Sequence, residues 1–279
     1  MPVYTLANND CKKSEVNMIW QTANNIATQA LENNSLQPIA SQLVTTYAHG
    51  VQFTYHLRNE FAEKKPHQTT QTNNPFLPHE PAMFVAQCGL QHKVLLNKYP
   101  VIQPHLLVCA NQFVAQNTVL NLSDFNAWLR IINDKSAQHP TLGFYNSEPT
   151  AGASQPHRHM QVVQLTLALI DERPYLSHFL AGADFVAYHN SDPQTLYTVY
   201  LKGLSALNLM KNEQQTHPHN LLVTHNLLWI LPRSQVQTDG IYANGLNFAG
   251  HFLLKNKTQL TWLLEHDPFD ILKKLIKIN

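Results

Sequence analysis

Two apolar runs joined by a short polar turn, NLLVTHNLLWILP at residues 220–232, constrain the fold of this chain more than any other feature. The break between the runs predicts a β-hairpin that turns near His225 and Asn226. The stretch VQFTYHL at residues 51–57 alternates apolar and polar side chains, as a half-buried strand does. Strands in hairpins pair antiparallel, and the expected elements do not alternate regularly between strand and helix along the chain. We therefore expect an α+β protein with a largely antiparallel sheet flanked by helices.

Four further runs indicate strands, and four positions indicate where helices begin. The strand-like runs are AMFVAQ, KVLLNKYPV, HLLVCA and LGFYN, at residues 82–87, 93–101, 105–110 and 142–146. The helix starts are residues that can cap a helix or occupy its first turn: Ser14 for a helix over residues 14–32, Ser123, Asp192 with Pro193 for a helix over residues 192–211, and Asp267 with Pro268. The polar, proline-rich residues 64–81 are expected to form a long loop.

Charge and cysteine content argue against several classes of protein. The chain has 19 lysine and arginine residues against 18 aspartate and glutamate residues, so it lacks the basic excess of a nucleic-acid binder. No apolar run approaches the ~20 residues that span a bilayer. Cys11, Cys88 and Cys109 are far apart, odd in number and include no C-x-x-C pair, so they indicate neither a disulfide framework nor a cysteine zinc site; the last two are expected in the core. We expect a cytoplasmic protein without nucleic-acid or membrane partners.

The stretch GASQPHRHMQVV, residues 152–163, carries the main candidate site. If the chain forms a strand from His157 onward, the side chains of His157, His159 and Gln161 project from the same face. Three interpretations of the histidines are open at this point. They can lie at a strand edge without any chemistry. They can be two of the three or four ligands that zinc needs, although no other cluster in the chain has ligand spacing. One of them can instead be a nucleophile.

The nucleophile hypothesis uses every part of this stretch. A neutral imidazole can attack a phosphate through one ring nitrogen when the other ring N–H is held by an acceptor. Phosphoryl transfer then depends on positioning and on donors around the phosphoryl oxygens. Gln161, Ser154 and a lysine can supply such donors. The flexible polar run from Gly152 to Gln155 suits an anionic oxygen for the same reason.

The string H-R-H-M-Q resembles the motif of the histidine-triad superfamily, in the transferase branch where glutamine replaces the third histidine. The longer string FYNSEPTAGASQPHRHMQ closely resembles one family, the diadenosine tetraphosphate phosphorylases, also called ATP adenylyltransferases. Two further stretches are similar to that family: residues 74–113, which contain an N-K-Y step, and PHNLLVTHNLLWILPRS at residues 218–234. Together the three stretches are spread over most of the range from residue 51 to residue 235.

The resemblance implies a histidine-triad, nucleotidyltransferase-like fold in two parts. Residues 1–175 would form an N-terminal nucleotidyltransferase domain that carries the H-x-H-x-Q motif, and residues 176–279 a C-terminal domain that completes the nucleotide site. By the same resemblance, His159 is the nucleophile that forms an adenylyl-histidine. His157 supports the geometry of the loop and strand, and Gln161 hydrogen-bonds a phosphoryl oxygen.

Further residues match positions at which the family contacts its substrate. They are Asn97, Lys98, Asn146, Gly152, Ala153, Ser154, Gln155, His219 and Asn220. His219 departs from the family pattern, which has serine or tyrosine at this position. A basic residue that the family carries in the first strand region corresponds to Arg58, Lys64 or Lys65. Arg233 is expected to be a solvated residue at a strand end rather than a phosphate ligand.

The implied activity is reversible phosphorolysis of diadenosine tetraphosphate with inorganic phosphate to ATP and ADP. The partners are then small nucleotides and phosphate, with no tightly bound cofactor and no protein-bound metal; Mg²⁺ would arrive on the polyphosphate. Three alternatives are a hexose-1-phosphate uridylyltransferase, a dinucleoside polyphosphate hydrolase and a non-enzymatic nucleotide-binding protein. Arg158 in place of the proline of H-P-H-x-Q argues against the first, and Gln161 in place of a third histidine argues against the second. An intact motif argues against the last.

Overall fold

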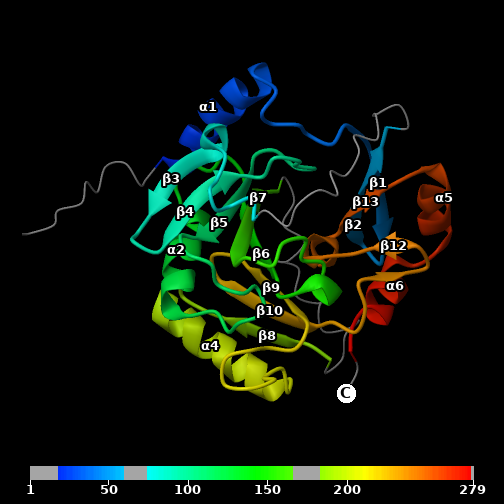
Figure 1. The fold of residues 1–279 in the computed structure, drawn as a ribbon. Coiled ribbons are helices and arrows are strands. Elements are labelled where there is room, and N and C mark those ends of the chain that lie inside the picture. Colours follow the sequence, from blue (N-terminus) through cyan, green and yellow to red (C-terminus); the bar gives the residue numbers. More distant parts are fainter. Residues whose placement is uncertain (1–17, 60–73, 166–182, 278–279) are drawn as a thin grey trace, which may run out of the picture.

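The computed structural model describes residues 18–59, 74–165 and 183–277. Its centre is an eight-stranded sheet in the order β3-β4-β5-β7-β6-β9-β10-β8, and each neighbouring pair is antiparallel (Figure 1). The strands are β3 (Phe84–Cys88), β4 (His92–Leu96), β5 (His105–Ala110), β6 (Thr141–Asn146), β7 (His159–Gln164), β8 (Phe185–Tyr188), β9 (His219–Val223) and β10 (Leu227–Pro232). The predicted α+β class with a largely antiparallel sheet is confirmed.

Three helices cover one face of this sheet (Figure 1): α1 (Ile19–Glu32), α2 (Leu122–Ile132) and α4 (Pro193–Ala206). Their apolar sides pack on the strand residues that point toward them. The resulting core contains Trp20 of α1, Trp128 of α2 and Tyr200 of α4, together with Met160 and Val162 of β7. The even-numbered residues of the H-R-H-M-Q strand therefore face the helices.

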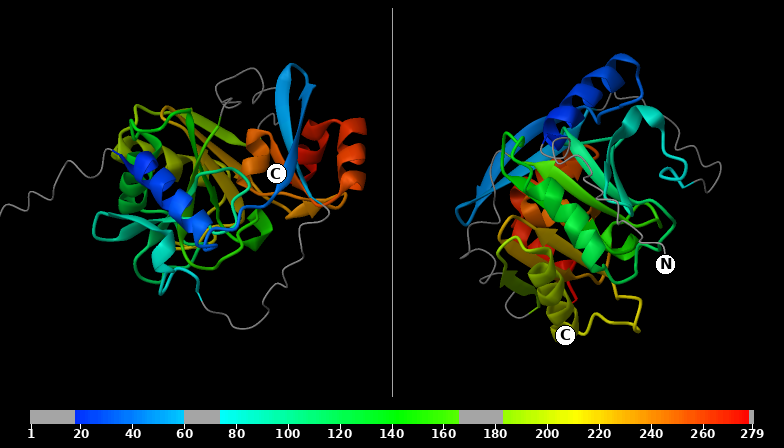
Figure 2. Two further views of the ribbon diagram at one scale, coloured as in Figure 1. Left: turned by 90° about the horizontal axis from the view of Figure 1, so that it is seen from above. Right: turned by 90° about the vertical axis from the view of Figure 1, so that its left-hand side faces the viewer.

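A smaller sheet and two helices lie on the opposite side (Figure 2): β1 (Ser41–Ala48), β2 (Val51–Arg58), β13 (His251–Leu254), α5 (Lys257–Glu265) and α6 (Pro268–Lys274). Strand β13 pairs with β2 in parallel, so a strand from near the C-terminus completes the N-terminal hairpin. A second apolar core, which includes Phe53, Phe252, Phe144 and Val163, joins this unit to the large sheet. The division into residues 1–175 and 176–279 stays a prediction.

Shorter elements complete the described chain. They are the 3-10 turns η1 (Pro81–Met83), η2 (Pro149–Ala151) and η4 (Gly245–Ala249), and the strand pair β11 (Gln237–Thr238) and β12 (Ile241–Tyr242). The helices found in the described ranges are all too short or too polar to cross a membrane.

Two of the predicted helix starts are confirmed. Asp192 accepts a hydrogen bond from the Thr195 N–H and Pro193 opens α4, although this helix ends at Ala206 rather than near residue 211. Asp267 caps α6 in the same way. These starts are predictable because a cap and a proline act within one turn of the helix.

The other two helix starts need correction. The side chain of Asn121, not that of Ser123, caps α2, because Asn121 and Asp124 each accept a hydrogen bond from the other's backbone N–H. The first helix begins at Ile19 with no side-chain cap, and the proposed cap Ser14 lies outside the described residues.

The predicted strands agree closely with the structure. The hairpin of β9 and β10 turns at residues 224–226, and HLLVCA and LGFYN lie in β5 and β6. The strand predicted over residues 93–101 was too long, because β4 ends at Leu96. There the Asn97 side chain accepts a hydrogen bond from the Tyr99 N–H and turns the chain. Most of the loop predicted over residues 64–81 lies outside the described residues.

Candidate active site

Strand β7 places His159 and Gln161 on the face of the sheet opposite helices α1, α2 and α4. In the register, His159 lies opposite Cys109 of β5, and Gln161 lies between Leu107 of β5 and Phe144 of β6. Side chains opposite one another in a sheet share a face. The predicted alternation is therefore confirmed for His159 and Gln161. The strand predicted from His157 onward was two residues too long, because β7 begins at His159 and His157 forms only an isolated bridge with Ala115.

His159 has the state that a nucleophilic imidazole needs. Its Nδ1 atom lies 2.8 Å from the backbone carbonyl oxygen of His157. A carbonyl can only accept, so Nδ1 carries the proton and Nε2 keeps its lone pair. The ring is 4% exposed, and burial lowers the pKa of His159 to about 4. Because desolvation penalises the charged form, the ring is neutral near pH 7.

His157 has a supporting position. Its Nε2 atom lies 2.9 Å from the carbonyl oxygen of Ala110, and its Nδ1 atom lies 2.9 Å from the Asn74 amide nitrogen. Both ring nitrogens are thus engaged with protein groups, so His157 is poorly placed to act as a nucleophile or a metal ligand. Phe76 contacts the rings of both His157 and His159 and covers this part of the site.

Gln116 holds the backbone of His159 and was not identified from the sequence. The ladder between β6 and β7 ends at Phe144 and Gln161, where the two strands separate. The Gln116 amide fills the gap: its oxygen accepts from the His159 N–H at 2.9 Å, and its nitrogen donates to the carbonyl oxygen of Asn146 at 2.8 Å. Gln116 lies in a polar loop, so no local pattern separates it from its neighbours.

The loop before β7 provides different donors from those expected. The N–H groups of Gly152 and Ala153 donate to the carbonyl oxygens of Pro149 and Glu148, which closes the turn at η2. They are therefore not free for an anion. The N–H groups of Ser154 and Gln155 have no hydrogen-bond partner within the described ranges, and the Ser154 side chain is exposed. Of the predicted phosphate loop, Ser154 and Gln155 are the residues with donors to offer.

Gly152 is required by the packing of this loop. Its φ angle is +91°, in the left-handed region that glycine adopts most easily. A Cβ atom at this position would also lie 2.6 Å from the Cβ of Asn244 and 2.9 Å from the carbonyl oxygen of Ala243. Gly152 thus allows the loop to pack directly on the segment that leads into η4.

Asn146 and Asn220 lie on the same face as Gln161 and contact each other. The Asn220 amide nitrogen donates to the Asn146 side-chain oxygen at 2.8 Å, and this oxygen also accepts from the Gly245 N–H at 2.9 Å. Both asparagines are almost fully buried. Their amides join β6, β9 and η4 at the edge of the candidate site.

Arg233 is buried at this junction, and the expectation that it is solvated is wrong. It is 2% exposed and donates to the Asn220 side-chain oxygen at 2.6 Å and to the carbonyl oxygen of Gln235 at 2.8 Å. No carboxylate of the described chain pairs with it. Burial lowers the pKa of Arg233 to about 10, so it stays charged at pH 7. Next to the loop of Gly152, its positive charge therefore has no carboxylate partner among the described residues.

The predicted pair Asn97 and Lys98 separates in the structure. The Asn97 side chain turns inward and contacts the ring of His105. Lys98 turns outward and forms an ion pair of 2.8 Å with Glu80, in which both side chains are more than a third exposed. An exposed ion pair of this kind contributes little to the stability of the fold. Of the basic candidates in the first strand region, Lys64 and Lys65 lie outside the described residues, whereas Arg58 ends β2.

Lys93 is a basic residue on the candidate face that sequence reasoning did not select. It lies opposite Cys109 in the register, and Cys109 lies opposite His159, so the three share a face across β4, β5 and β7. Lys93 is 5% exposed and has no ion pair with a described residue. Burial lowers the pKa of Lys93. A lysine within the apolar run HKVLL was the available signal.

His219 is not brought together with the other predicted residues. It alternates with Asn220 along β9 and therefore points to the opposite face, where it packs on Tyr145 and Tyr200. It is fully buried, and its Nδ1 atom bonds to the carbonyl oxygen of His217 at 2.9 Å. Asn220, but not His219, has the orientation expected of a site residue.

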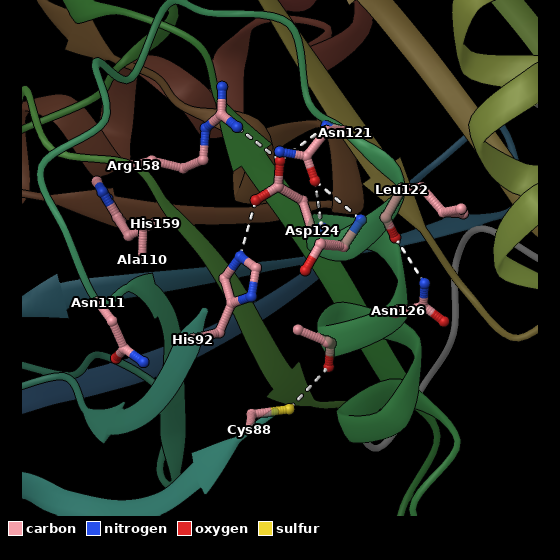
Figure 3. Close-up of polar contacts among 12 residues, drawn as sticks. Cys88, His92, Ala110, Asn111, Asn121, Leu122, Asp124, Asn126, Arg158 and His159 are labelled. Carbon is pink, nitrogen blue, oxygen red and sulfur yellow. Dashed lines mark hydrogen bonds and ion pairs between the residues drawn. The ribbon is translucent and has the colours of Figure 1, made fainter. Parts of the chain in front are cut away.

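Arg158 also points away from the site. Figure 3 shows its guanidinium and the ring of His92 converging on the carboxylate of Asp124, at 2.6 Å and 2.8 Å. All three side chains are buried beneath α2. This network fixes β7 to the helix layer from behind, and it explains why arginine rather than proline separates the two histidines.

No cluster of three or more potential metal ligands occurs among the residues that the structure describes.

Comparisons with known proteins agree with this architecture. Residues 9–181 match the family described as Ap4A phosphorylase N-terminal domain, and residues 172–276 match that described as ATP adenylyltransferase C-terminal domain. Diadenosine 5',5'''-P1,P4-tetraphosphate phosphorylase 2 of Saccharomyces cerevisiae is 27% identical over 225 residues, which cover 67% of this chain and 69% of the yeast protein. Protein APA1 of the same yeast is 25% identical over 268 residues, or 81% of this chain and 84% of that protein.

The fold is also shared with a solved structure. The crystal structure of yeast Ap4A phosphorylase Apa2 in complex with Ap4A has a TM-score of 0.74 at 22% identity, over 92% of this chain and 96% of that chain. At this identity the likeness establishes the fold alone. The first family match extends over more than half of the chain, from residue 9 through the H-R-H-M-Q strand. This protein therefore belongs to the Ap4A phosphorylase family of ATP adenylyltransferases.

Proposed function

We propose that this protein phosphorolyses diadenosine tetraphosphate (Ap4A) to ATP and ADP through an adenylyl group on His159. One observation carries the proposal beyond family membership. The Nδ1 proton of His159 is directed at the His157 carbonyl oxygen, so the Nε2 lone pair is left as a nucleophile on the same face as Gln161. The neutral, buried ring has this form without a general base to deprotonate it.

In the first half-reaction, Nε2 of His159 attacks the α-phosphorus of Ap4A. The new N–P bond forms as the bond from phosphorus to the bridging oxygen breaks, and ATP leaves. The imidazole gains positive charge, which its Nδ1–H shares with the His157 carbonyl oxygen 2.8 Å away. Gln161 and the free donors of Ser154 and Gln155 are proposed to bind the phosphoryl oxygens, where fixed donors stabilise the developing charge.

In the second half-reaction, an oxygen of inorganic phosphate attacks the same phosphorus. The N–P bond breaks, ADP departs, and His159 returns to its neutral form. Each half-reaction reverses, so ATP and ADP can also form Ap4A. Mg²⁺ is expected to arrive with the polyphosphate, whose charge it offsets. The charge of the buried Arg233, which pairs with no carboxylate in the described part of the chain, adds to the attraction for the substrate.

Product analysis with and without phosphate tests the proposal. We expect ATP and ADP when Ap4A and phosphate are both present. Without phosphate we expect at most one equivalent of ATP per protein, together with retained label when the adenylate is labelled. ATP and AMP released continuously in phosphate-free buffer would instead identify a hydrolase. Binding of Ap4A without any turnover in either buffer would identify a nucleotide-binding protein.

A further inference from the structure

Asn97, His105 and Gln161 form a chain of hydrogen bonds that ends at the candidate site. The Asn97 amide nitrogen lies 3.1 Å from Nδ1 of His105, and Nε2 of His105 lies 3.0 Å from the side-chain oxygen of Gln161. His105 is 7% exposed and Gln161 is 8% exposed. The chain crosses from the end of β4 through β5 to β7, so three segments far apart in sequence contribute to it.

The direction of this chain is set at its outer end. The Asn97 side-chain oxygen accepts a hydrogen bond of 3.1 Å from the backbone N–H of Tyr99, which can only donate. The Asn97 amide nitrogen must then be the group that faces His105, and it donates to Nδ1. A neutral imidazole that accepts at Nδ1 carries its proton on Nε2. His105 therefore donates to the Gln161 oxygen.

We infer that His105 is a positioning residue that orients the Gln161 amide, with the oxygen held by the ring and the NH2 group directed at the phosphoryl group on His159. This inference rests on the proposed function. The Gln161 amide nitrogen has no hydrogen-bond partner in the described part of the chain, so it is available to a ligand. A rotated amide would present its oxygen to the phosphoryl oxygens and would repel them instead.

The ring of His105 is suited to this task because it stays neutral. Burial lowers the pKa of His105 to about 4, and His159 is the titratable group that faces it. The two buried imidazoles are then held in opposite tautomers. His105 carries its proton on Nε2 and donates it to the Gln161 oxygen, which fixes the orientation of that amide. His159 carries its proton on Nδ1 and keeps the Nε2 lone pair for attack.

The tautomer can be observed directly, without any measurement of activity. In ¹⁵N-histidine-labelled protein near pH 7, long-range proton–nitrogen correlations distinguish a protonated ring nitrogen from a bare one. His105→Phe identifies the His105 signals by their loss. We expect a proton on Nε2 and a bare Nδ1. A proton on Nδ1, or on both nitrogens, would overturn the inference even if the enzyme phosphorolyses Ap4A as proposed.

A double-mutant cycle tests the coupling to Gln161. We expect His105→Phe to lower the single-turnover rate of adenylyl transfer roughly tenfold, with little change in KM, because Gln161 then lacks a fixed orientation. In the Gln161→Ala background the same substitution should change the rate by less than about twofold, since there is no amide left to orient. His189→Phe, which replaces another buried histidine next to the outermost strand β8, is the matched control for loss of an imidazole.

Two kinetic outcomes would count against His105 as a positioning residue. If His105→Phe slows transfer equally in both backgrounds, its effect is a general one on the fold. If His105→Phe alone transfers the adenylyl group at the wild-type rate while Gln161→Ala is slow, the Gln161 amide is oriented by a group other than His105. A protein that never accepts an adenylyl group fails the proposed function instead, and the tautomer measurement still decides the state of His105.

Discussion

The Nδ1 atom of His159 lies 2.8 Å from the carbonyl oxygen of His157, and this contact sets the chemistry available at the site. The two histidines of the motif are thus connected through the backbone of His157 and the ring of His159, not through their two rings. The ring of His157 is held in turn by Ala110 and Asn74. The first histidine thus positions a carbonyl, and the carbonyl fixes the tautomer of the second.

We predict that adenylyl transfer to His159 is insensitive to pH over most of the range in which the protein is folded. The pKa of His159 is lowered to about 4, so the ring is neutral well above pH 5. Below this pKa the Nε2 lone pair takes a proton and attack stops. Single-turnover rates in phosphate-free buffer should stay level from pH 8 to pH 5.5 and fall only as the pH approaches 4. A pH–rate profile with its midpoint near the ordinary histidine pKa of about 6.5 would contradict this prediction.

We predict that His159→Asn folds but accepts no adenylyl group. Adenylate-labelled Ap4A without phosphate should leave on the wild type a label that is acid-labile and base-stable, and phosphate should release it as ADP. His157→Asn is the matched variant: it disturbs the support of the site but keeps the Nε2 nucleophile, so it should still take some label. Label that persists in His159→Asn would remove the role assigned to this residue.

We predict that Gln161→Ala slows adenylyl transfer on the order of a hundredfold, because one fixed donor to a developing charge is worth ~3 kcal/mol. The loss should appear mainly in kcat, because the Gln161 amide nitrogen is not used within the described fold. Thermal stability should fall as well, because the buried His105 ring loses the acceptor of its Nε2–H. A folded Gln161→Ala protein with a normal rate would exclude this role.

The features that could be predicted from the sequence are local ones. Alternation along the H-R-H-M-Q strand placed His159 and Gln161 on one face, and the cap and proline at Asp192 placed the start of a helix. The contacts of His105, Gln116 and Arg233 could not be predicted, because each depends on the register between segments far apart in the chain. Arg233 illustrates the limit: a residue after a strand-ending proline is usually solvated, but here β9, η2 and the segment before η4 enclose it.

We predict that Gly152→Ala destabilises the protein more than Gly50→Ala, which is its matched control. Both glycines have positive φ angles, +91° and +81°, so both variants bear the cost of a left-handed alanine, of order 1 kcal/mol. Only at Gly152 does the new Cβ atom also meet backbone, 2.9 Å from the carbonyl oxygen of Ala243; around Gly50 nothing lies within 4 Å. Denaturant unfolding should therefore show an additional loss of ~1–3 kcal/mol for Gly152→Ala.

The same pair separates stability from activity. Because Gly152 fixes the loop that presents Ser154 and Gln155, Gly152→Ala should also lower kcat for Ap4A below the value for Gly50→Ala when both proteins are fully folded. Equal free energies of unfolding and equal rates for the two variants would show that the loop accommodates a side chain at residue 152.

We predict that Lys93 binds the polyphosphate more strongly than Lys98 does. Lys93 lies two strands from His159 on the same face, a backbone separation of ~10 Å that a lysine side chain and an extended polyphosphate can bridge. Its ammonium has no ion pair within the residues described, whereas Lys98 already pairs with Glu80 at 2.8 Å. Lys93→Met keeps the apolar stem and removes the charge, so it should preserve the thermal stability.

The expected effect of Lys93→Met is an increase in KM for Ap4A of roughly tenfold or more, because a hydrogen bond to a charged group is worth ~1.5–3 kcal/mol. Lys98→Met should raise KM less, since the exposed ion pair shows that its side chain is turned toward solvent. Raising the salt concentration should narrow the difference in KM for Ap4A between Lys93→Met and the wild type. Salt screens the attraction between the Lys93 ammonium and the polyphosphate, which the variant has already lost. An unchanged KM in folded Lys93→Met, with a raised KM in Lys98→Met, would reverse the assignment and place the polyphosphate over the outer end of β4.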